Sequence, residues 1–129
     1  MRPRTRLLIV VALLVTLLLA AWAGGLFGGR RLSTEADQVV LLHGLGRTEN
    51  AMWYLRHRLE ESGYRVVNVG YPSRSESPEA LVRHIREEIE AAIDPELTVH
   101  FVTHSLGGLL GRAYLQDRPL PHLGRVVML

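Results

Sequence analysis

The sequence predicts an α/β fold with an open, mostly parallel sheet, and three observations support this prediction. Short apolar segments rich in β-branched residues alternate with helical patterns from residue 38 onward, an order typical of parallel sheets. Apolar residues recur at helical spacing between these segments. Two of the segments run directly into glycine-containing turns. A chain of 129 residues has room for one small domain at most.

The first 31 residues have the composition of a membrane-targeting segment. Three arginines precede an apolar run over residues 7–23 that only Thr16 interrupts. Such a hydrophobic helix of about 17 residues is near the lower limit for spanning a bilayer. The small-x-small form of Ala21-Trp22-Ala23 indicates a cleavable signal peptide, whereas the basic N-terminal end favours a retained transmembrane anchor. The domain is therefore expected to be held at the cell membrane on its exported side, or periplasmic or secreted after cleavage.

The charge is unevenly distributed along the chain. Five of the 15 arginines lie in the first 31 residues, where there is no acidic residue, and the remainder carries 10 arginines against 13 acidic residues. The sequence therefore predicts no nucleic-acid-binding surface. The absence of cysteine excludes disulfides, thiolate metal sites and a cysteine nucleophile. Residues 32–37 are interpreted as a linker to a partial domain over residues 38–129.

The first half of that domain is predicted to contain two strands around one helix. Residues 37–42 form the first strand, and Thr48 or Asn50 is expected to cap the helix that follows. Gly63 ends the helix, and residues 64–69 form the second strand. The apolar positions of this helix are Met52, Leu55 and Leu59.

A second helix is predicted to begin after Ser77, which has Pro78 at the first helical position and Glu79 in the first turn. Pro95 stops it before a third strand over residues 97–102. Its expected buried face consists of Leu81, Val82, Ile85, Ile89 and Ile93.

The last helix is predicted from Leu106 to about Gln116, followed by a strand over residues 125–129. An apolar strand at the chain terminus leaves a half-built sheet, so the domain is interpreted as truncated at its C-terminus. The residues expected on the buried face of this helix are Leu106, Leu109, Leu110 and Ala113.

The motif Thr103-His104-Ser105-Leu106-Gly107-Gly108 has the layout of a nucleophile elbow. In such an elbow a sharp strand-to-helix turn lifts the serine hydroxyl to the top of a parallel sheet. Gly107 is expected because a side chain there would collide with the tight turn. Thr103 stands where glycine is commoner, and we expect a slightly looser elbow. His104 is expected to pack structurally beside the serine.

A second motif, His43-Gly44-Leu45-Gly46, follows the first strand. An acyl-transfer enzyme stabilises the oxyanion of its tetrahedral intermediate with backbone N–H groups that are fixed in advance. Leu106 is expected to provide one of these groups and Leu45 the other, with Gly44 and Gly46 allowing close backbone approach. His43 is expected to support this loop rather than to act as a base.

Together, the two motifs resemble the α/β-hydrolase superfamily, in particular its bacterial lipase- and esterase-like members. The resemblance covers residues 38–129, where threonine at the position of Thr103 is frequent within the subgroup. It implies the N-terminal part of an α/β-hydrolase parallel sheet with flanking helices. It also implies that Ser105 is the nucleophile and that the N–H groups of Leu45 and Leu106 form the oxyanion hole. No cofactor or metal is expected.

The sequence offers Ser105 no obvious catalytic partners. α/β hydrolases carry the acid and the histidine after the serine, and here only Asp117 and His122 follow it. A helix rising about 1.5 Å per residue would carry Asp117 some 15 Å or more away, with His122 in the same far loop. By resemblance, the acid and the histidine of the triad lie in loops beyond Leu129.

The expected function is therefore hydrolysis of carboxylic esters, with lipid or other acyl esters as substrates on resemblance alone. An acyltransferase would use the same acyl-enzyme. A catalytically incompetent remnant or a membrane-anchored binding module is the alternative of a different class, and the missing acid and histidine favour it. Ser105 as an ordinary helix N-cap would leave the glycines unexplained. Of the other histidines, His57 and His84 are expected to be solvated and His100 to pack.

Overall fold

The computed structural model describes residues 15–16 and 36–129. The chain divides into two compact units, Met1–Ser33 and Thr34–Leu129, and the elements named below belong to the second. Apart from residues 15–16, the expected membrane segment over residues 1–31 lies outside the described part, as does the linker as far as residue 35. Within the described part, the structure contains no helix that is long and apolar enough to cross a membrane.

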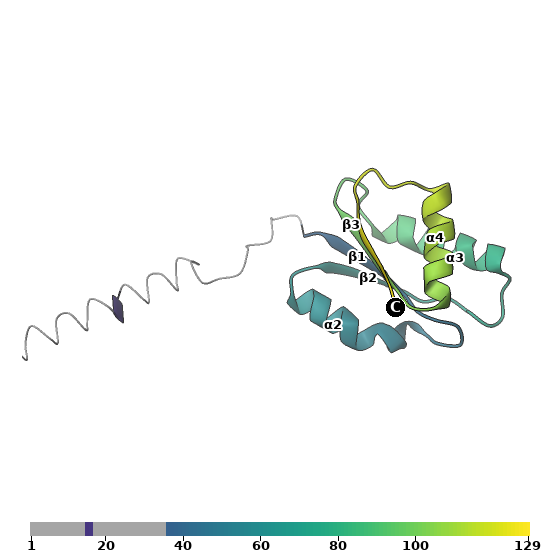
Figure 1. Ribbon diagram of the computed structural model, residues 1–129, viewed down its shortest axis with the longest axis horizontal. Helices are drawn as coiled ribbons and strands as arrows, with labels where there is room; N and C mark the ends of the chain where they lie inside the picture. The colour runs from purple at the N-terminus through teal and green to yellow at the C-terminus, as the bar shows by residue number, and fades with distance from the viewer. Residues whose placement is uncertain (1–14, 17–35) are drawn as a thin grey trace, which may run out of the picture. The chain divides into compact units, whose positions relative to one another are not determined.

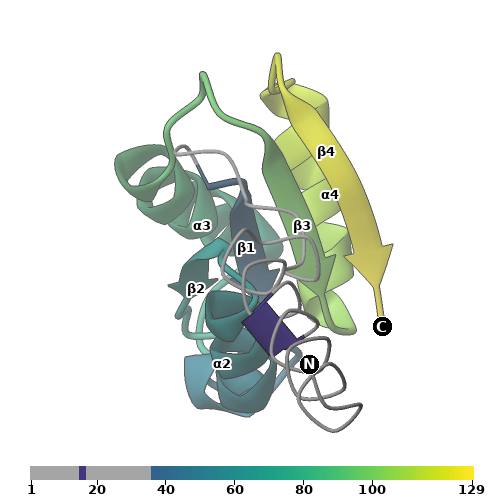
Figure 2. The same ribbon diagram turned by 90° about the vertical axis from the view of Figure 1, so that its left-hand side faces the viewer.

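Four parallel strands form one sheet, as the sequence predicts, and their order in the sheet is β2-β1-β3-β4 (Figures 1 and 2). The last strand begins two residues before the predicted Arg125. Figure 2 shows β3 and β4 side by side and running in the same direction. The strands span Gln38–Leu42 (β1), Arg65–Val69 (β2), Val99–Thr103 (β3) and Leu123–Met128 (β4).

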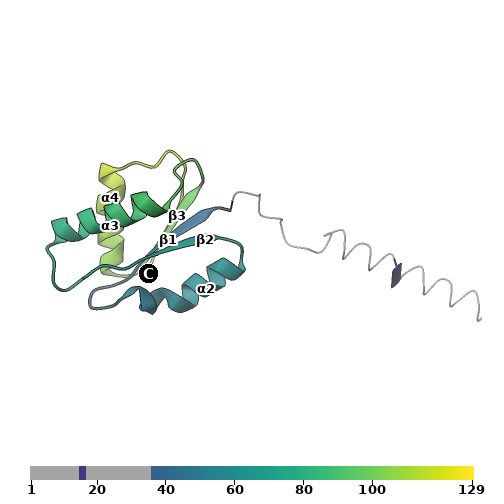
Figure 3. The same cartoon turned by 180° about the vertical axis from the view of Figure 1, so that it is seen from behind.

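Helices cover both faces of this sheet. Helix α2 packs on one face, and α3 and α4 pack on the other (Figures 1 and 3). All five residues of β1 are buried because this strand lies between both layers. Val40 contributes to the core beneath α3 and α4, and Leu41 to the core beneath α2. The helical elements span Glu49–Met52 (η1, a 3-10 turn), Trp53–Glu61 (α2), Pro78–Ala92 (α3) and Leu106–Asp117 (α4).

The predicted helix start at Ser77 is confirmed, whereas Thr48 is the N-cap residue of η1, not of α2, and makes no side-chain cap. The Ser77 hydroxyl oxygen accepts a hydrogen bond from the N–H of Ala80, with Pro78 as the first helical residue. Before α2, the chain instead forms η1. There the Thr48 carbonyl, not its side chain, accepts a hydrogen bond from the N–H of Ala51. Backbone hydrogen bonding in the turn thus replaces the side-chain cap.

The predicted buried face of α4 is wrong at one position: Leu110 is buried and Leu106 packs against the core, but Leu109 faces outward. Leu109, which the apolar pattern places in the core, is 66% exposed. A Cβ atom at Gly107 would lie only 2.5 Å from the Leu42 carbonyl oxygen, so this glycine must face the end of β1. That contact sets the rotation of the helix and turns Leu109 outward. The buried residues of α4 are Gly107, Gly108, Leu110, Gly111 and Tyr114.

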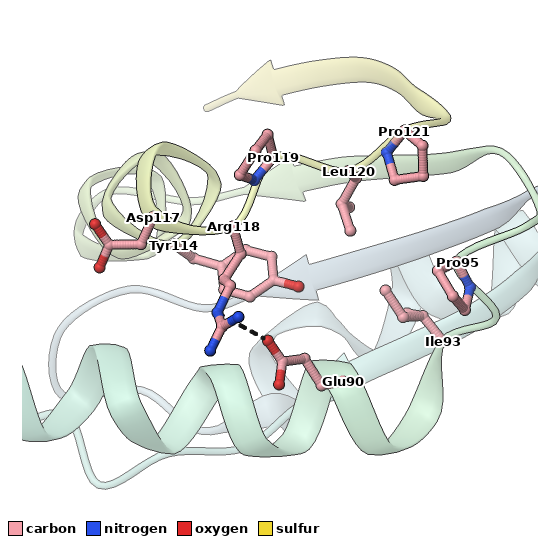
Figure 4. Close-up of a pocket in the computed structure, with 9 residues that line it drawn as sticks. All are labelled: Glu90, Ile93, Pro95, Tyr114, Asp117, Arg118, Pro119, Leu120 and Pro121. Carbon is pink, nitrogen blue, oxygen red and sulfur yellow. Dashed lines mark ion pairs between the residues drawn. The ribbon is translucent and has the colours of Figure 1, made fainter.

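A cavity of about 410 Å³ lies between the C-terminal ends of α3 and α4 (Figure 4). Tyr114 is fully buried in its wall, and Figure 4 shows the hydroxyl turned toward the cavity. That hydroxyl has no hydrogen-bond partner among the described residues. Burial raises the pKa of Tyr114, and the nearby Glu90 adds to this effect. Glu90 itself pairs with Arg118, with N and O atoms 3.6 Å apart.

We expect Tyr114→Phe to leave the free energy of unfolding unchanged or to raise it by up to about 1 kcal/mol. The variant keeps the ring and removes a buried hydroxyl that lacks a protein partner. Urea denaturation of the wild type and the variant measures the difference. A loss of 1 kcal/mol or more would show that this hydroxyl makes a stabilising hydrogen bond, for example to a trapped water.

Candidate active site

Ser105 occupies a strained turn between β3 and α4. Its backbone angles are φ 51° and ψ −119°, and it is the one non-glycine residue with positive φ in the described part of the chain. This conformation is costly for a residue with a Cβ atom and persists only where its surroundings enforce it. The N–H of His104 donates to the Leu42 carbonyl at 2.9 Å, and that of Ser105 donates to the Leu129 carbonyl at 3.0 Å. The sharp turn expected from the sequence is present, and Ser105 is exposed on it.

Gly107 allows this turn to dock on the neighbouring strand. A Cβ atom there would lie 2.5 Å from the Leu42 oxygen and 2.8 Å from the His43 oxygen. The sequence predicts a glycine here because of the tight turn itself. The structure corrects the reason: the obstacle is the backbone at the end of β1.

Thr103 is accommodated by glycines on α4 rather than by a looser elbow. Its side chain is buried and faces Gly108 and Gly111, where added Cβ atoms would lie 3.3 Å from its Oγ1 and 3.5 Å from its Cγ2. The hydroxyl also donates to the Val127 carbonyl at 3.4 Å. The Thr103 side chain on β3 thus occupies space that the two glycines on α4 leave free.

The loop formed by residues 43–46, called the oxyanion loop below, lies against the elbow. A Cβ atom at Gly44 would be 3.4 Å from the Cβ of Ser105 and 2.7 Å from Nδ1 of His104. The structure therefore brings together the two motifs that are about sixty residues apart in the sequence. In the described part of the chain, the backbone N–H groups of Leu45 and Leu106 have no hydrogen-bond acceptor. Both donors are free to bind an external oxygen.

His43 is fully buried, and both of its ring nitrogens are engaged away from Ser105. The N–H of Tyr71 donates to Nε2 at 3.4 Å, which leaves Nδ1 to donate to the Gly44 carbonyl at 2.9 Å. The imidazole also stacks on the Tyr71 ring, with centroids 3.9 Å apart. This geometry supports the oxyanion loop and leaves no nitrogen of His43 to deprotonate Ser105.

Sequence reasoning missed Ser73. This residue lies in the loop after β2, is only 7% exposed, and its Oγ accepts a hydrogen bond from the Gly46 N–H at 2.9 Å. Gly46 itself has φ 68°, a conformation that favours glycine. The available signal was Gly70-Tyr71-Pro72-Ser73, a turn directly after the strand that pairs with β1. Tyr71, in the same turn, lies beside the site and stacks on His43.

His104 is exposed rather than packed in the interior. Its ring lies against Gly44 and borders a groove of about 490 Å³ between the elbow and α2. Met52, Leu55 and Leu129 provide the apolar part of this groove. The groove therefore opens directly beside the Ser105 turn and provides a place for an apolar group of a ligand.

No described residue completes a catalytic triad with Ser105. Asp117 lies about 18 Å away along α4 and pairs with Arg86 at 3.0 Å. The His122 carbonyl accepts a hydrogen bond from the N–H of Val99, which is the first residue of β3. Ser105, in contrast, comes after the last residue of that strand. His122 is thus at the opposite end of the sheet. The described residues also contain no cluster of three metal-binding side chains.

Comparisons with known proteins agree with this geometry. A model of the alpha/beta hydrolase family matches residues 39–129. An extracellular α/β-hydrolase from a Paenibacillus species, described as a structural and functional homologue of tobacco salicylic acid binding protein 2, aligns with a TM-score of 0.60 and 20% identity over 70% of this chain. A mutant of polyneuridine aldehyde esterase aligns with a TM-score of 0.61 and 22% identity over 73% of this chain. No curated protein matches. The aligned parts make up 39% and 40% of those two structures, which are similar in fold.

Proposed function

Because this chain belongs to the alpha/beta hydrolase family, we propose that the protein hydrolyses carboxylic esters through an acyl-enzyme on Ser105. The observation that carries the proposal is the strained, exposed turn at Ser105 beside a loop with an unpaired N–H group. Strain of this kind is retained at functional sites because the surrounding structure enforces it. An ordinary helix N-cap would need neither the strain nor the adjoining loop.

In the proposed reaction, Ser105 Oγ attacks the ester carbonyl carbon and the carbonyl oxygen becomes an oxyanion. The N–H groups of Leu45 and Leu106 donate hydrogen bonds to that oxyanion. Leu106 is the first residue of α4, so the positive end of the helix dipole also favours the negative charge. The base that takes the Ser105 proton returns it to the departing alcohol as the intermediate collapses to the acyl-enzyme. Water then attacks the acyl-enzyme, and the acid and free Ser105 are released.

A serine of this kind needs a base and an orienting carboxylate. We propose that both come from residues after Leu129. The backbone of Leu129 supports this position because its carbonyl accepts from the Ser105 N–H and its N–H donates to the Thr103 carbonyl. Residues that follow Leu129 in the chain would therefore begin beside Ser105. Reading the coding DNA past the Leu129 codon tests the proposal: an acid followed by a histidine is expected, and an immediate stop would favour the remnant.

The proposed substrates are lipid or other acyl esters. The groove beside Ser105, with its apolar Met52, Leu55 and Leu129, is suited to an acyl chain. One of the similar structures is by name an esterase. The predicted N-terminal signal or anchor would place the domain at the membrane on its exported side, or release it there.

We expect a fluorescent phosphonate ester to label the protein expressed from its whole reading frame, with the adduct on the peptide that contains Ser105. Such probes trap serines activated by a base and an oxyanion hole, and unfolded protein provides the control. Mass spectrometry locates the adduct, and product analysis with an added alcohol separates hydrolysis from acyl transfer. Absence of labelling in folded protein would favour the remnant or binding module.

A further inference from the structure

We propose that Tyr71 and Ser73 act as positioning residues that hold the oxyanion loop in its catalytic shape. The two residues, called the loop clamp below, touch neither the substrate nor Ser105 in the proposed mechanism. Their effect would pass through the Leu45 N–H group. This inference rests on the proposed function and assigns a role to the loop that follows β2.

The loop clamp binds the oxyanion loop at both ends. The Tyr71 hydroxyl donates to the His43 carbonyl, and the Ser73 hydroxyl oxygen accepts from the Gly46 N–H at 2.9 Å. Leu45 lies between these two points. Tyr71 is 6% exposed and Ser73 is 7% exposed, so water does not compete freely for either hydrogen bond.

Apart from the loop clamp, the hydrogen bonds that restrain the oxyanion loop within the described residues are at Gly44, whose carbonyl accepts from His43 Nδ1 and from the Arg47 N–H. Neither of them holds Leu45 itself. The Leu45 side chain is 60% exposed, and glycines stand on either side of it. An oxyanion hole works only if its donors are fixed before the charge develops, and one donor is worth about 100- to 1,000-fold in kcat. A misplacement of about 1 Å can cost about 100-fold.

The loop clamp is itself held by the sheet and by α3. Leu42 and Val69 are partners in the parallel register, so the two chains leave the sheet side by side. The Ser73 N–H donates to the Tyr71 carbonyl at 2.9 Å, which closes the loop on itself. His84 of α3, which the sequence analysis expected to be solvated, is half-buried instead, and its Nε2 contacts the Gly70 carbonyl oxygen at 3.1 Å.

The test compares Tyr71→Phe and Ser73→Ala with matched controls. Tyr64→Phe removes a tyrosine hydroxyl from the other end of β2, and Ser75→Ala removes an exposed serine hydroxyl from the same loop. We expect each clamp variant to lower kcat and the rate of phosphonate labelling at least about tenfold with KM unchanged. The double variant should lose less than the product of the two single effects, because both act on one loop. The controls should match the wild type.

Amide hydrogen exchange gives a readout that does not depend on catalysis. Exchange at Gly46 should accelerate in both clamp variants and stay at the wild-type rate in both controls. If the wild type is labelled and the clamp variants label at the same rate as the controls, the clamp is overturned and the proposed function stands. An unlabelled wild type would overturn the proposed function. If the wild type is unlabelled, the exchange rate at Gly46 still tests the loop clamp. An unchanged rate in the clamp variants would overturn the clamp as well, whereas a faster rate would show that the clamp restrains the loop.

Discussion

Ser105→Gly is expected to give a protein that is inactive and more stable than Ser105→Ala. Both variants lose the hydroxyl, so ester hydrolysis should fall at least about a thousandfold in each. They differ in the Cβ atom, which alanine retains at φ 51° and glycine lacks. Glycine adopts such angles without steric cost, and a strained residue costs about 1–3 kcal/mol, part of which the entropy of glycine offsets. A net difference of about 1 kcal/mol is expected.

Urea denaturation of the two variants measures this difference, and ester hydrolysis is assayed on the same preparations. Equal unfolding free energies for Ser105→Gly and Ser105→Ala would mean that the turn stores no strain. Activity that survives in Ser105→Ala would contradict the assignment of the nucleophile. Ser75→Ala, in the exposed turn after β2, controls for the loss of a serine hydroxyl.

Gly107→Ala is expected to destabilise the fold far more than Gly108→Ala. An added Cβ would lie 2.5 Å from a backbone oxygen at position 107 but 3.3 Å from a side-chain oxygen at position 108. Overpacking costs about 1–3 kcal/mol, and more where the obstacle is backbone that cannot move aside. The gain in helix propensity, up to about 1 kcal/mol, is common to both sites and cancels in the comparison.

The two alanine variants are compared by urea denaturation, with a difference of at least about 2 kcal/mol expected. Gly107→Ala should also slow phosphonate labelling, because pushing α4 away from β1 moves the Leu106 N–H from the oxyanion position. Gly108→Ala should label at the wild-type rate. Equal stability of the two variants would contradict the conclusion that Gly107 sets the rotation of α4.

The elements that the sequence predicted well are those determined by local pattern. Alternation of apolar strands and helices predicted the four parallel strands, and Ser77-Pro78 predicted the start of α3. The outward position of Leu109 was missed because hydrophobicity alone does not show which side of a glycine-rich helix approaches a strand. The sequence likewise did not show why position 107 needs glycine. The obstacle is the backbone of Leu42, which lies 65 positions earlier in the chain.

The sequence by itself determined the strand order along the chain, the turn at Ser105 and the loop at residues 43–46, because each depends on residues that are neighbours in the chain. The distance of Asp117 and His122 from Ser105 likewise followed from the sequence, because the length of the intervening helix α4 sets it. Only the tertiary structure decided that Gly44 lies against Ser105 and that Ser73 binds Gly46. The physical reason is that parallel pairing brings together the carboxyl ends of strands that are distant in sequence. Contacts across these ends depend on register and helix rotation, which no local pattern encodes.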